Sequence, residues 1–269
     1  MNDRKLRVVV VEDSLTVRRR LCEALGSARD IEIVGEGDNG QRAIELCQRL
    51  RPDVVTLDMN LPVMSGLSAT EYIMAHCPTP ILIVSASTNR GELFKTYDAL
   101  AAGAVDVLEK PRGDDSDLDW DERFLGAVRL VSKIKVITHL RARLNPERRR
   151  SAPVPAYVGA PAAPAADSRS PPLSVIALGA STGGPSALVS VLRDLPRLPK
   201  LTILVVLHID EPFGSAFADW LSDHTPHAVR FAQDGELLEA SGARVLMAQP
   251  GRHLLADGLR LRLSDEAER

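Results

Sequence analysis

The second half of the chain is organised around one stretch, Leu178-Gly179-Ala180-Ser181-Thr182-Gly183-Gly184-Pro185. It continues an apolar run that begins at Val175, so its glycines predict a tight turn from a buried strand into a helix, with Ser181 exposed as a potential nucleophile. A second apolar run, Ile203 to Leu207, ends in His208, a potential general base at the same end of a neighbouring strand. The pair predicts a hydrolytic site.

Taken alone, the glycine-rich turn has other interpretations. Such turns also bind phosphate groups or let a helix pack close to a strand, and a serine there is often only an N-cap. A histidine after a strand is likewise often an ordinary loop residue. The rest of the chain is therefore needed to choose between catalysis and these alternatives.

Composition limits the class of protein. With 269 residues, 45% of them hydrophobic, the chain is long enough for two domains. Its 33 basic and 36 acidic residues nearly balance, which argues against a nucleic-acid partner. The apolar runs are too short for a signal peptide or a membrane span, and the three cysteines lack metal-ligand spacing. We therefore expect a cytoplasmic protein without membrane insertion.

From Arg7 to about Asn145 the sequence alternates short β-branched runs with amphipathic segments. This alternation predicts a doubly wound α/β domain with a parallel, flavodoxin-like sheet. The expected strands are Val8–Val11, Ile31–Val34, Val54–Leu57, Ile81–Val84 and Val105–Leu108.

Polar residues follow these strands at the end of the sheet where ligands usually bind. They are Glu12 and Asp13, Asp58, Ser85 and Lys110. Converging carboxylates repel one another, so they need a lysine and a hard cation, and Mg²⁺ prefers oxygen ligands. Asp58 could then attack a phosphoryl group in line. For any single acid, a helix cap is the simpler interpretation.

The whole set resembles the receiver domain of two-component response regulators. The resemblance is carried by Glu12-Asp13, Asp58-Met59-Asn60-Leu61-Pro62, Gly66, Ser85-Ala86 and Lys110-Pro111. It implies that Asp58 accepts phosphate from a histidine kinase. It also implies that Glu12, Asp13, Asp58 and the backbone of Asn60 hold Mg²⁺, and that Ser85 and Lys110 sense the phosphoryl group.

One position departs from the receiver pattern. Val107 stands where receivers usually carry an aromatic switch residue, three positions before the lysine. Coupling through the movement of an aromatic ring is therefore in doubt. Two nearby aromatic residues, Phe94 and Tyr97, have helical spacing and are expected in the core.

The segment between the two halves predicts first a helix and then a tether. Residues Glu122 to Asn145 carry one apolar helical face, formed by Ala127, Leu130, Val131, Ile134 and Ile137. Residues 146–172 contain seven prolines and many alanines, and such a composition cannot bury a core. We therefore expect domains at residues 1–145 and 173–269, joined by a Pro/Ala-rich linker at 146–172.

After Leu173 the alternation of strands and helices resumes, which predicts a partial Rossmann-like α/β domain. The expected elements are a strand to Leu178, a helix from about Ser186 to Leu192, a strand to Leu207, a helix with Phe213, Phe217, Trp220 and Leu221 on one face, strands at Val229–Ala232 and Arg244–Ala248, and a hairpin around Asp257-Gly258.

With a receiver in front, this half resembles the chemotaxis protein-glutamate methylesterase family, CheB. The resemblance is carried by Gly179 to Pro185, His208, Phe213 to Leu221, Asp234-Gly235 and Ala248 to Leu254. It implies that Ser181 is the nucleophile, Thr182 supports the site and His208 is the general base, with no cofactor for the ester chemistry.

The same resemblance implies the substrate, the partners and the regulation. The substrate would be a glutamate methyl ester on the cytoplasmic helices of a chemoreceptor, and some members of the family also deamidate glutamine. The kinase would be the chemotaxis histidine kinase. In the family, the unphosphorylated receiver shields the catalytic face, and an acyl phosphate at Asp58 would loosen that packing.

Two features depart from the methylesterase pattern. The family's triad aspartate lies in a Gly-Met-Gly-x-Asp-Gly segment that is not reached before Arg269, and Leu207-His208-Ile209-Asp210 replaces the usual Gln-His-Met-Pro. We therefore expect an incomplete second domain with an open sheet edge and impaired esterase activity. The competing interpretation is a non-enzymatic response regulator with a vestigial esterase domain.

Overall fold

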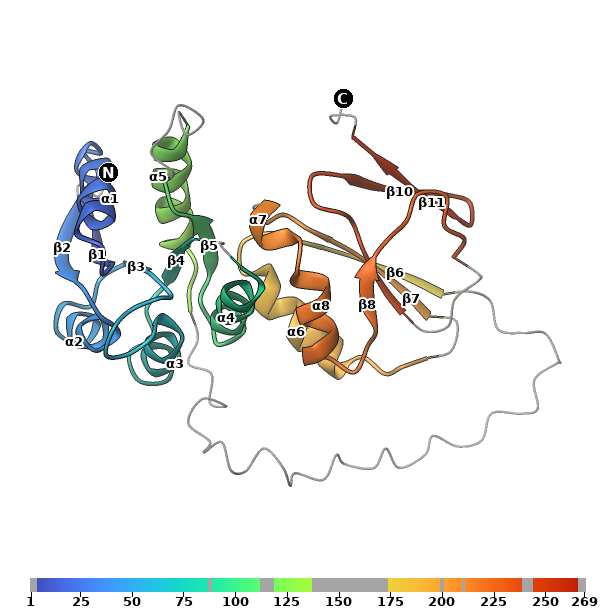
Figure 1. Cartoon of the computed structure of the whole chain (residues 1–269), viewed down its shortest axis with the longest axis horizontal. Helices are drawn as coiled ribbons and strands as arrows, with labels where there is room; N and C mark the ends of the chain where they lie inside the picture. Colours follow the sequence, from blue (N-terminus) through green and yellow to red (C-terminus); the bar gives the residue numbers. More distant parts are fainter. Residues whose placement is uncertain are drawn as a thin grey trace, which may run out of the picture.

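The computed structural model contains two α/β lobes side by side, an N-terminal lobe within residues 4–136 and a C-terminal lobe within residues 174–265 (Figure 1). It describes residues 4–86, 89–111, 119–136, 174–198, 201–209, 211–238 and 244–265. The predicted linker at 146–172 lies outside these residues. None of the helices in the described parts combines the length and the apolar character that a membrane-spanning helix needs.

The N-terminal lobe is built on a five-stranded parallel sheet with the strand order β2-β1-β3-β4-β5. Its central strands are apolar runs buried on both faces, as a parallel sheet with helices on each side requires. The predicted doubly wound sheet is confirmed. The strands are β1 (Leu6–Val11), β2 (Ile31–Gly37), β3 (Val54–Leu57), β4 (Ile81–Ser85) and β5 (Asp106–Glu109).

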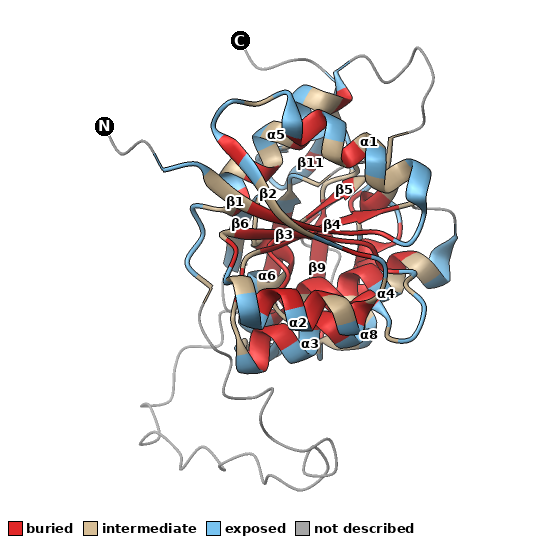
Figure 2. Cartoon of the chain, turned by 90° about the vertical axis from the view of Figure 1, so that its left-hand side faces the viewer, coloured by how far each residue is buried: buried red, intermediate tan, exposed pale blue. Residues whose placement is uncertain are grey.

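Helices cover both faces of this sheet, α1 and α5 on one side and α2, α3 and α4 on the other (Figure 2). Four of them begin at a side-chain cap, because Ser14, Asn39, Ser65 and Asn89 each accept a hydrogen bond from an N–H of the first turn. The helices are α1 (Leu15–Gly26), α2 (Gly40–Leu50), α3 (Gly66–His76), α4 (Arg90–Ala101) and α5 (Trp120–Val131).

The predicted connector helix is shorter than expected. Helix α5 ends at Val131, and the next backbone N–H groups close turns onto Val128, Leu130 and Val131. Its buried face is also different from the predicted stripe, since Leu130 is 46% exposed and Ile134 is 37% exposed. The buried positions are Trp120, Phe124, Val128 and Val131, which pack on the sheet. Ile137 and the rest of the predicted helix lie outside the described residues.

The C-terminal lobe contains a four-stranded parallel sheet, in the order β6-β7-β9-β8, and an antiparallel hairpin, β10-β11. In the described part of the chain β6 is an edge strand, and its residue Val175 is 45% exposed. One predicted helix is divided into α7 and α8. The elements are β6 (Ser174–Ala180), α6 (Gly184–Asp194), β7 (Leu201–Leu207), α7 (Glu211–Gly214), α8 (Phe217–His224), β8 (Val229–Phe231), β9 (Arg244–Met247), β10 (His253–Asp257) and β11 (Arg260–Ser264).

The two lobes meet where α4 packs against α6 and α8 (Figure 1). Tyr97 of α4 is fully buried there, with its ring centroid 5.2 Å from that of Phe217 and 5.5 Å from that of Trp220. Its hydroxyl donates a hydrogen bond to the carbonyl oxygen of Phe213. The prediction that Tyr97 lies in the core is confirmed, although this core belongs partly to the contact between the lobes.

Two glycines test how tightly the N-terminal lobe is packed. A Cβ atom on Gly66 would lie 2.1 Å from the carbonyl oxygen of Asp58, so we expect Gly66→Ala to lower the free energy of unfolding by about 3 kcal/mol. A Cβ atom on Gly126, in helix α5, would meet nothing within 4 Å, so Gly126→Ala should raise that free energy by about 0.5–1 kcal/mol. Chemical denaturation of the two variants measures both effects. Equal stability of the two variants would contradict this packing.

Candidate functional site

The serine turn has the predicted strand-to-helix geometry. Strand β6 ends at Ala180, Ser181 follows in the loop, and α6 begins at Gly184 with a proline in its first turn. Gly183 adopts φ 76°, a left-handed conformation that favours glycine. A Cβ atom on Gly184 would lie 2.8 Å from that of Ala180, so the close approach of helix and strand also needs glycine. The sequence pattern is therefore explained by the backbone.

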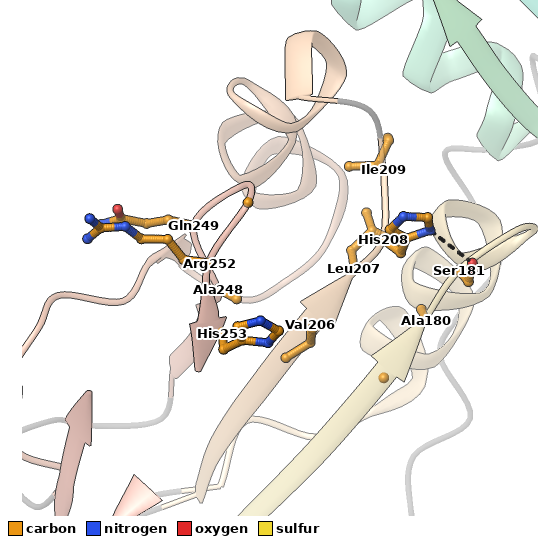
Figure 3. Close-up of a pocket in the computed structure, with 12 residues that line it drawn as sticks. Ala180, Ser181, Val206, Leu207, His208, Ile209, Ala248, Gln249, Arg252 and His253 are labelled. Atoms are coloured by element: carbon orange, nitrogen blue, oxygen red, sulfur yellow. Dashed lines mark hydrogen bonds between the residues drawn. The ribbon is translucent and has the colours of Figure 1, made fainter. Parts of the chain in front are cut away.

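Strand pairing brings His208 next to this turn. Strands β6 and β7 are parallel and in register up to Ala180 and Leu207, and the backbone N–H of His208 donates to the carbonyl oxygen of Ala180 at 2.9 Å. The Oγ of Ser181 lies 3.5 Å from Nδ1 of His208, and both side chains are exposed (Figure 3). This separation is longer than the 2.6–3.2 Å or so of a formed nucleophile–base hydrogen bond.

Ser181 and His208 lie at one side of a cavity of about 600 Å³. The carboxyl ends of β6 and β7 form one wall, and the loop that leads into β10 forms the other. Figure 3 shows Gln249 and Arg252 on the far side, pointing away from His208, and Arg252 is paired with Asp265 at 2.7 Å. The open space beside Ser181 can therefore receive an extended side chain from another molecule.

The third predicted site residue of this turn, Thr182, faces the N-terminal lobe. Its Oγ1 donates a hydrogen bond of 2.7 Å to Oδ2 of Asp106, the first residue of β5. The next backbone N–H, that of Gly183, donates to the carbonyl oxygen of Val105 at 2.8 Å. Sequence reasoning missed Asp106 because an acid at the start of a short strand carries no signal of a partner 76 residues away.

The polar residues predicted at the strand ends of the N-terminal lobe also lie together. One carboxylate oxygen from each of Glu12, Asp13 and Asp58 lies within 4.8 Å of the others. Nζ of Lys110 is 2.7 Å from Glu12 and 3.0 Å from Asp58. Ser85 is buried beside them at the end of β4, and among the described residues its Oγ has no hydrogen-bond partner. We call this group the acidic pocket.

Asn60 differs from the other predicted residues of the acidic pocket. Its side-chain amide nitrogen donates to Glu92 of α4 at 3.1 Å, so the side chain is turned toward α4. The sequence prediction concerned only the backbone of Asn60, which follows Asp58 and Met59 in the loop after β3. The loop itself is held at Asp58, whose Oδ1 accepts a hydrogen bond of 2.7 Å from the N–H of Met59.

Burial and neighbouring charges shift the pKa values of Glu12 and Lys110 in the acidic pocket. Burial raises the pKa of Glu12 to about 7, the hydrogen bond from Lys110 opposes this rise, and the charge of Asp58 adds to it. Burial lowers the pKa of Lys110, but the hydrogen bonds and charges of Glu12 and Asp58 outweigh it, and the net shift is upward. The pocket therefore holds more negative charge than one ammonium group neutralises.

A hard divalent cation fits this pocket. Its donors are carboxylate oxygens, which Mg²⁺ prefers, and a positive ion would relieve the repulsion between Glu12 and Asp58. Glu12, Asp13 and Asp58 would hold it, and it would supply charge neutralisation for a phosphoryl group. These three carboxylates belong to the predicted donor set, which also includes the backbone of Asn60.

The raised pKa of Glu12 predicts a pH dependence of Mg²⁺ binding. A proton and the metal compete for this carboxylate, so the apparent affinity should fall about tenfold per pH unit below about pH 7 and level off above pH 8. Calorimetric titration of the whole chain between pH 6 and 8 measures this. Glu12→Gln is the control, because it lacks the titrating group and should bind more weakly with a flat profile. Parallel profiles would contradict the role of Glu12.

Comparison with known proteins agrees with both halves of this arrangement. Residues 8–118 match the family described as response regulator receiver domain, and residues 176–269 match the family described as CheB methylesterase. A protein-glutamate methylesterase/protein-glutamine glutaminase from Syntrophus aciditrophicus is 40% identical over 255 residues, which are 94% of this chain and 70% of that protein.

The chain is also similar to a second methylesterase relative and to a solved receiver structure. A protein-glutamate methylesterase/protein-glutamine glutaminase from Anaeromyxobacter dehalogenans is 40% identical over 264 residues, which are 97% of this chain and 73% of that protein. The crystal structure of the response regulator domain of Thermotoga maritima CheB is 34% identical, covers 49% of this chain and 99% of its own, and has a TM-score of 0.45.

Proposed function

Because the chain belongs to the protein-glutamate methylesterase family, CheB, we propose that it hydrolyses glutamate methyl esters on chemoreceptors and that phosphorylation of Asp58 controls this activity. The observation that carries the proposal is the pair of Ser181 and His208, exposed side by side at the carboxyl ends of two parallel strands. The names of the relatives also include glutaminase activity, which the same site would perform on a glutamine side chain.

The proposed reaction uses the serine as the nucleophile. His208 takes the hydroxyl proton of Ser181 while Oγ attacks the ester carbonyl carbon, and the C–O bond to the methoxy group then breaks. The methoxy group leaves as methanol with the proton from His208. Water, deprotonated by His208, attacks the acyl-enzyme, and this step releases the glutamate carboxylate and free Ser181. With glutamine, ammonia would leave in place of methanol.

Charge on the carbonyl oxygen needs a donor close to the nucleophile. We assign the backbone N–H of Thr182, because the amide that follows the nucleophile on a strand-to-helix turn is well placed for an oxyanion. The amides of Gly183 and Gly184 donate within this structure to the carbonyl oxygens of Val105 and Ser181. The backbone N–H of Thr182 would thus stabilise the oxyanion, and its hydroxyl, which donates to Asp106, would fix the position of the turn.

The acidic pocket supplies the regulatory half of the proposal. Asp58 would attack the phosphoryl group of a chemotaxis histidine kinase, with Mg²⁺ held by Glu12, Asp13, Asp58 and the backbone carbonyl of Asn60. The phosphoryl group adds about 1.5–2 negative charges at this point. Lys110, already 3.0 Å from Asp58, and the buried hydroxyl of Ser85 would bind its oxygens.

One observation favours a second candidate function. Among the described residues, no carboxylate is hydrogen-bonded to His208, and the imidazole lies 3.5 Å from the Oγ of Ser181. A response regulator that acts by binding its partners without hydrolysis is consistent with this feature. The two candidate functions differ in one requirement: the esterase needs the hydroxyl of Ser181 for its activity, whereas the binding regulator does not.

Phosphorylation tests the first part of the proposal. We expect Asp58→Ala to abolish transfer of a phosphoryl group from the chemotaxis kinase, because the only proposed acceptor is removed. Transfer of radioactive phosphate from labelled kinase measures this. Asp38→Ala, which removes an exposed carboxylate of the same lobe, is the control and should be labelled normally. Normal labelling of the Asp58 variant would show that the acceptor is another residue.

Methanol release tests the second part. Ser181→Ala should reduce release of methanol from methylated receptor to the uncatalysed level, a loss of at least about a thousandfold, because nothing replaces the attacking oxygen. The matched control is Ser190→Ala, on the exposed face of α6, which should leave the rate unchanged. If the two variants release methanol equally well, the assignment of the nucleophile is wrong.

A further inference from the structure

The β10-β11 hairpin has one buried face and one exposed face. Side chains alternate between the two faces along each strand, and Leu261 of β11 is buried against Leu204 and Leu246 of the parallel sheet. On the opposite face, Leu255 and Arg262 are paired across the hairpin, and both are exposed. The hairpin therefore contributes one face to the core and presents the other to solvent.

A third segment extends the exposed face of the hairpin. Leu237 forms an antiparallel bridge with Arg260, and bridged residues point to the same side of a sheet. Leu255 is 51% exposed and Leu237 is 40% exposed. The guanidinium of Arg260 donates a hydrogen bond of 3.0 Å to the carbonyl oxygen of Gly235, which fixes this side chain against the third segment. We call Leu237, Leu255, Arg260 and Arg262 the hairpin face.

The hairpin face combines apolar surface with positive charge. Asp257 lies opposite Arg260 in the register of the hairpin and offsets part of its charge. Arg262 forms no ion pair with any residue in the described ranges, whereas its neighbour in the lobe, Arg252, is paired with Asp265. Exposed leucines beside arginines are typical of protein interfaces. The hairpin face therefore fits a partner that carries both apolar side chains and carboxylates.

The hairpin face begins at the rim of the cavity beside Ser181. His253, the first residue of β10, lines this cavity. At roughly 3.3 Å per residue, Leu255 lies about 7 Å further along the strand, and Asp257, opposite Arg260, lies about 13 Å further along. Figure 1 shows both strands on the side of the C-terminal lobe that faces away from the N-terminal lobe. A partner whose side chain enters the cavity can therefore lie along the hairpin face.

We propose that the hairpin face binds an acidic, amphipathic helix of the receptor, next to the glutamate ester that enters the cavity. This inference rests on the proposed function. Residues four and seven positions further along a helix lie about 6 and 10 Å from the first, because a helix rises 1.5 Å per residue. Glutamates at these positions would reach Arg262 and Arg260, and the apolar stripe of the helix would contact Leu255 and Leu237.

Charge complementarity identifies the occupant. Hydrolysis of each ester replaces a neutral group with a carboxylate, so a partly hydrolysed receptor helix carries negative charges around its remaining esters. Arginine binds carboxylates through charge-assisted hydrogen bonds. The hairpin face therefore prefers a helix on which some esters have already been hydrolysed, and it holds the receptor while the remaining esters react.

Binding of the whole chain to a cytoplasmic receptor fragment tests the hairpin face without any need for esterase activity. The fragment is prepared with its modified positions all glutamate or all glutamine, which is a neutral substitute for the ester. We expect the glutamate form to bind about tenfold more tightly, a difference of about 1.4 kcal/mol. Fluorescence anisotropy at low salt measures this, and the difference should shrink at high salt because salt screens exposed charges.

Three variants assign the effect to individual side chains. Arg262→Glu should weaken binding of the glutamate form about tenfold and remove the preference for it, because a carboxylate replaces the free guanidinium. Leu255→Ser should weaken both forms to a similar extent. The matched control is Arg197→Glu, which makes the same charge change at an exposed residue after α6, a helix on the opposite face of the sheet. It should leave both affinities unchanged, and unchanged thermal unfolding of all three variants shows that they are folded.

Several outcomes would overturn the inference. One is wild-type affinity of Arg262→Glu for the glutamate form, and another is an equal loss of affinity in Arg197→Glu. Self-association that Leu255→Ser abolishes, with receptor binding unchanged, would assign the hairpin face to a second copy of the chain. Binding to anionic lipid vesicles that Arg262→Glu abolishes, again with receptor binding unchanged, would assign it to a membrane surface.

Failure of the proposed function gives a different result. If methanol release does not depend on Ser181 while the variants change receptor binding as expected, the esterase assignment fails and the hairpin face stands. If release depends on Ser181 and the affinity for the receptor does not depend on Arg262 or Leu255, only the hairpin face is wrong.

Discussion

Parallel pairing of strands is the constraint on which both sites depend. Parallel strands end at the same edge of a sheet, so residues that follow them meet even when they are far apart in the chain. The register of β6 and β7 places Ser181 beside His208, 27 residues later. The order β1-β3-β4-β5 likewise gathers the acidic pocket from four separate loops. In both sites, strand order and register bring together residues that are distant in the sequence.

In the acidic pocket, burial and the repulsion between Glu12 and Asp58 disfavour the charged form of Glu12. Glu12 is fully buried, and burial raises its pKa to about 7 even though Lys110 lies 2.7 Å away. A carboxylate in this state is poorly compensated, so a cation bound beside it would stabilise its charged form.

The contact between the lobes divides into two parts of different physical character. Around Tyr97 it is a packed aromatic cluster with a few buried hydrogen bonds, which resists small displacements. At Asp106 it consists of two hydrogen bonds to a glycine-containing turn, which a shift of about one ångström would break. The contact between the lobes therefore combines close packing around Tyr97 with a few hydrogen bonds at Asp106 and Val105.

The sequence alone determined the five strands of the first sheet and the strand-turn-helix at Ser181, because hydrophobic period and glycine are local signals. Polar residues at the strand ends are also local signals, and they gave the candidate residues of both sites. It overestimated the length of α5. Leu130 and Ile134 of the predicted apolar face are exposed, whereas Val131 of the same face is buried as predicted. Only the tertiary structure decided that Asp106 contacts Thr182, that Tyr97 is buried between lobes, and that Glu12 titrates near neutrality. These properties depend on the spatial neighbours of a residue. The sequence around Thr182 or Asp106 gives no signal that the two residues, 76 positions apart, are in contact.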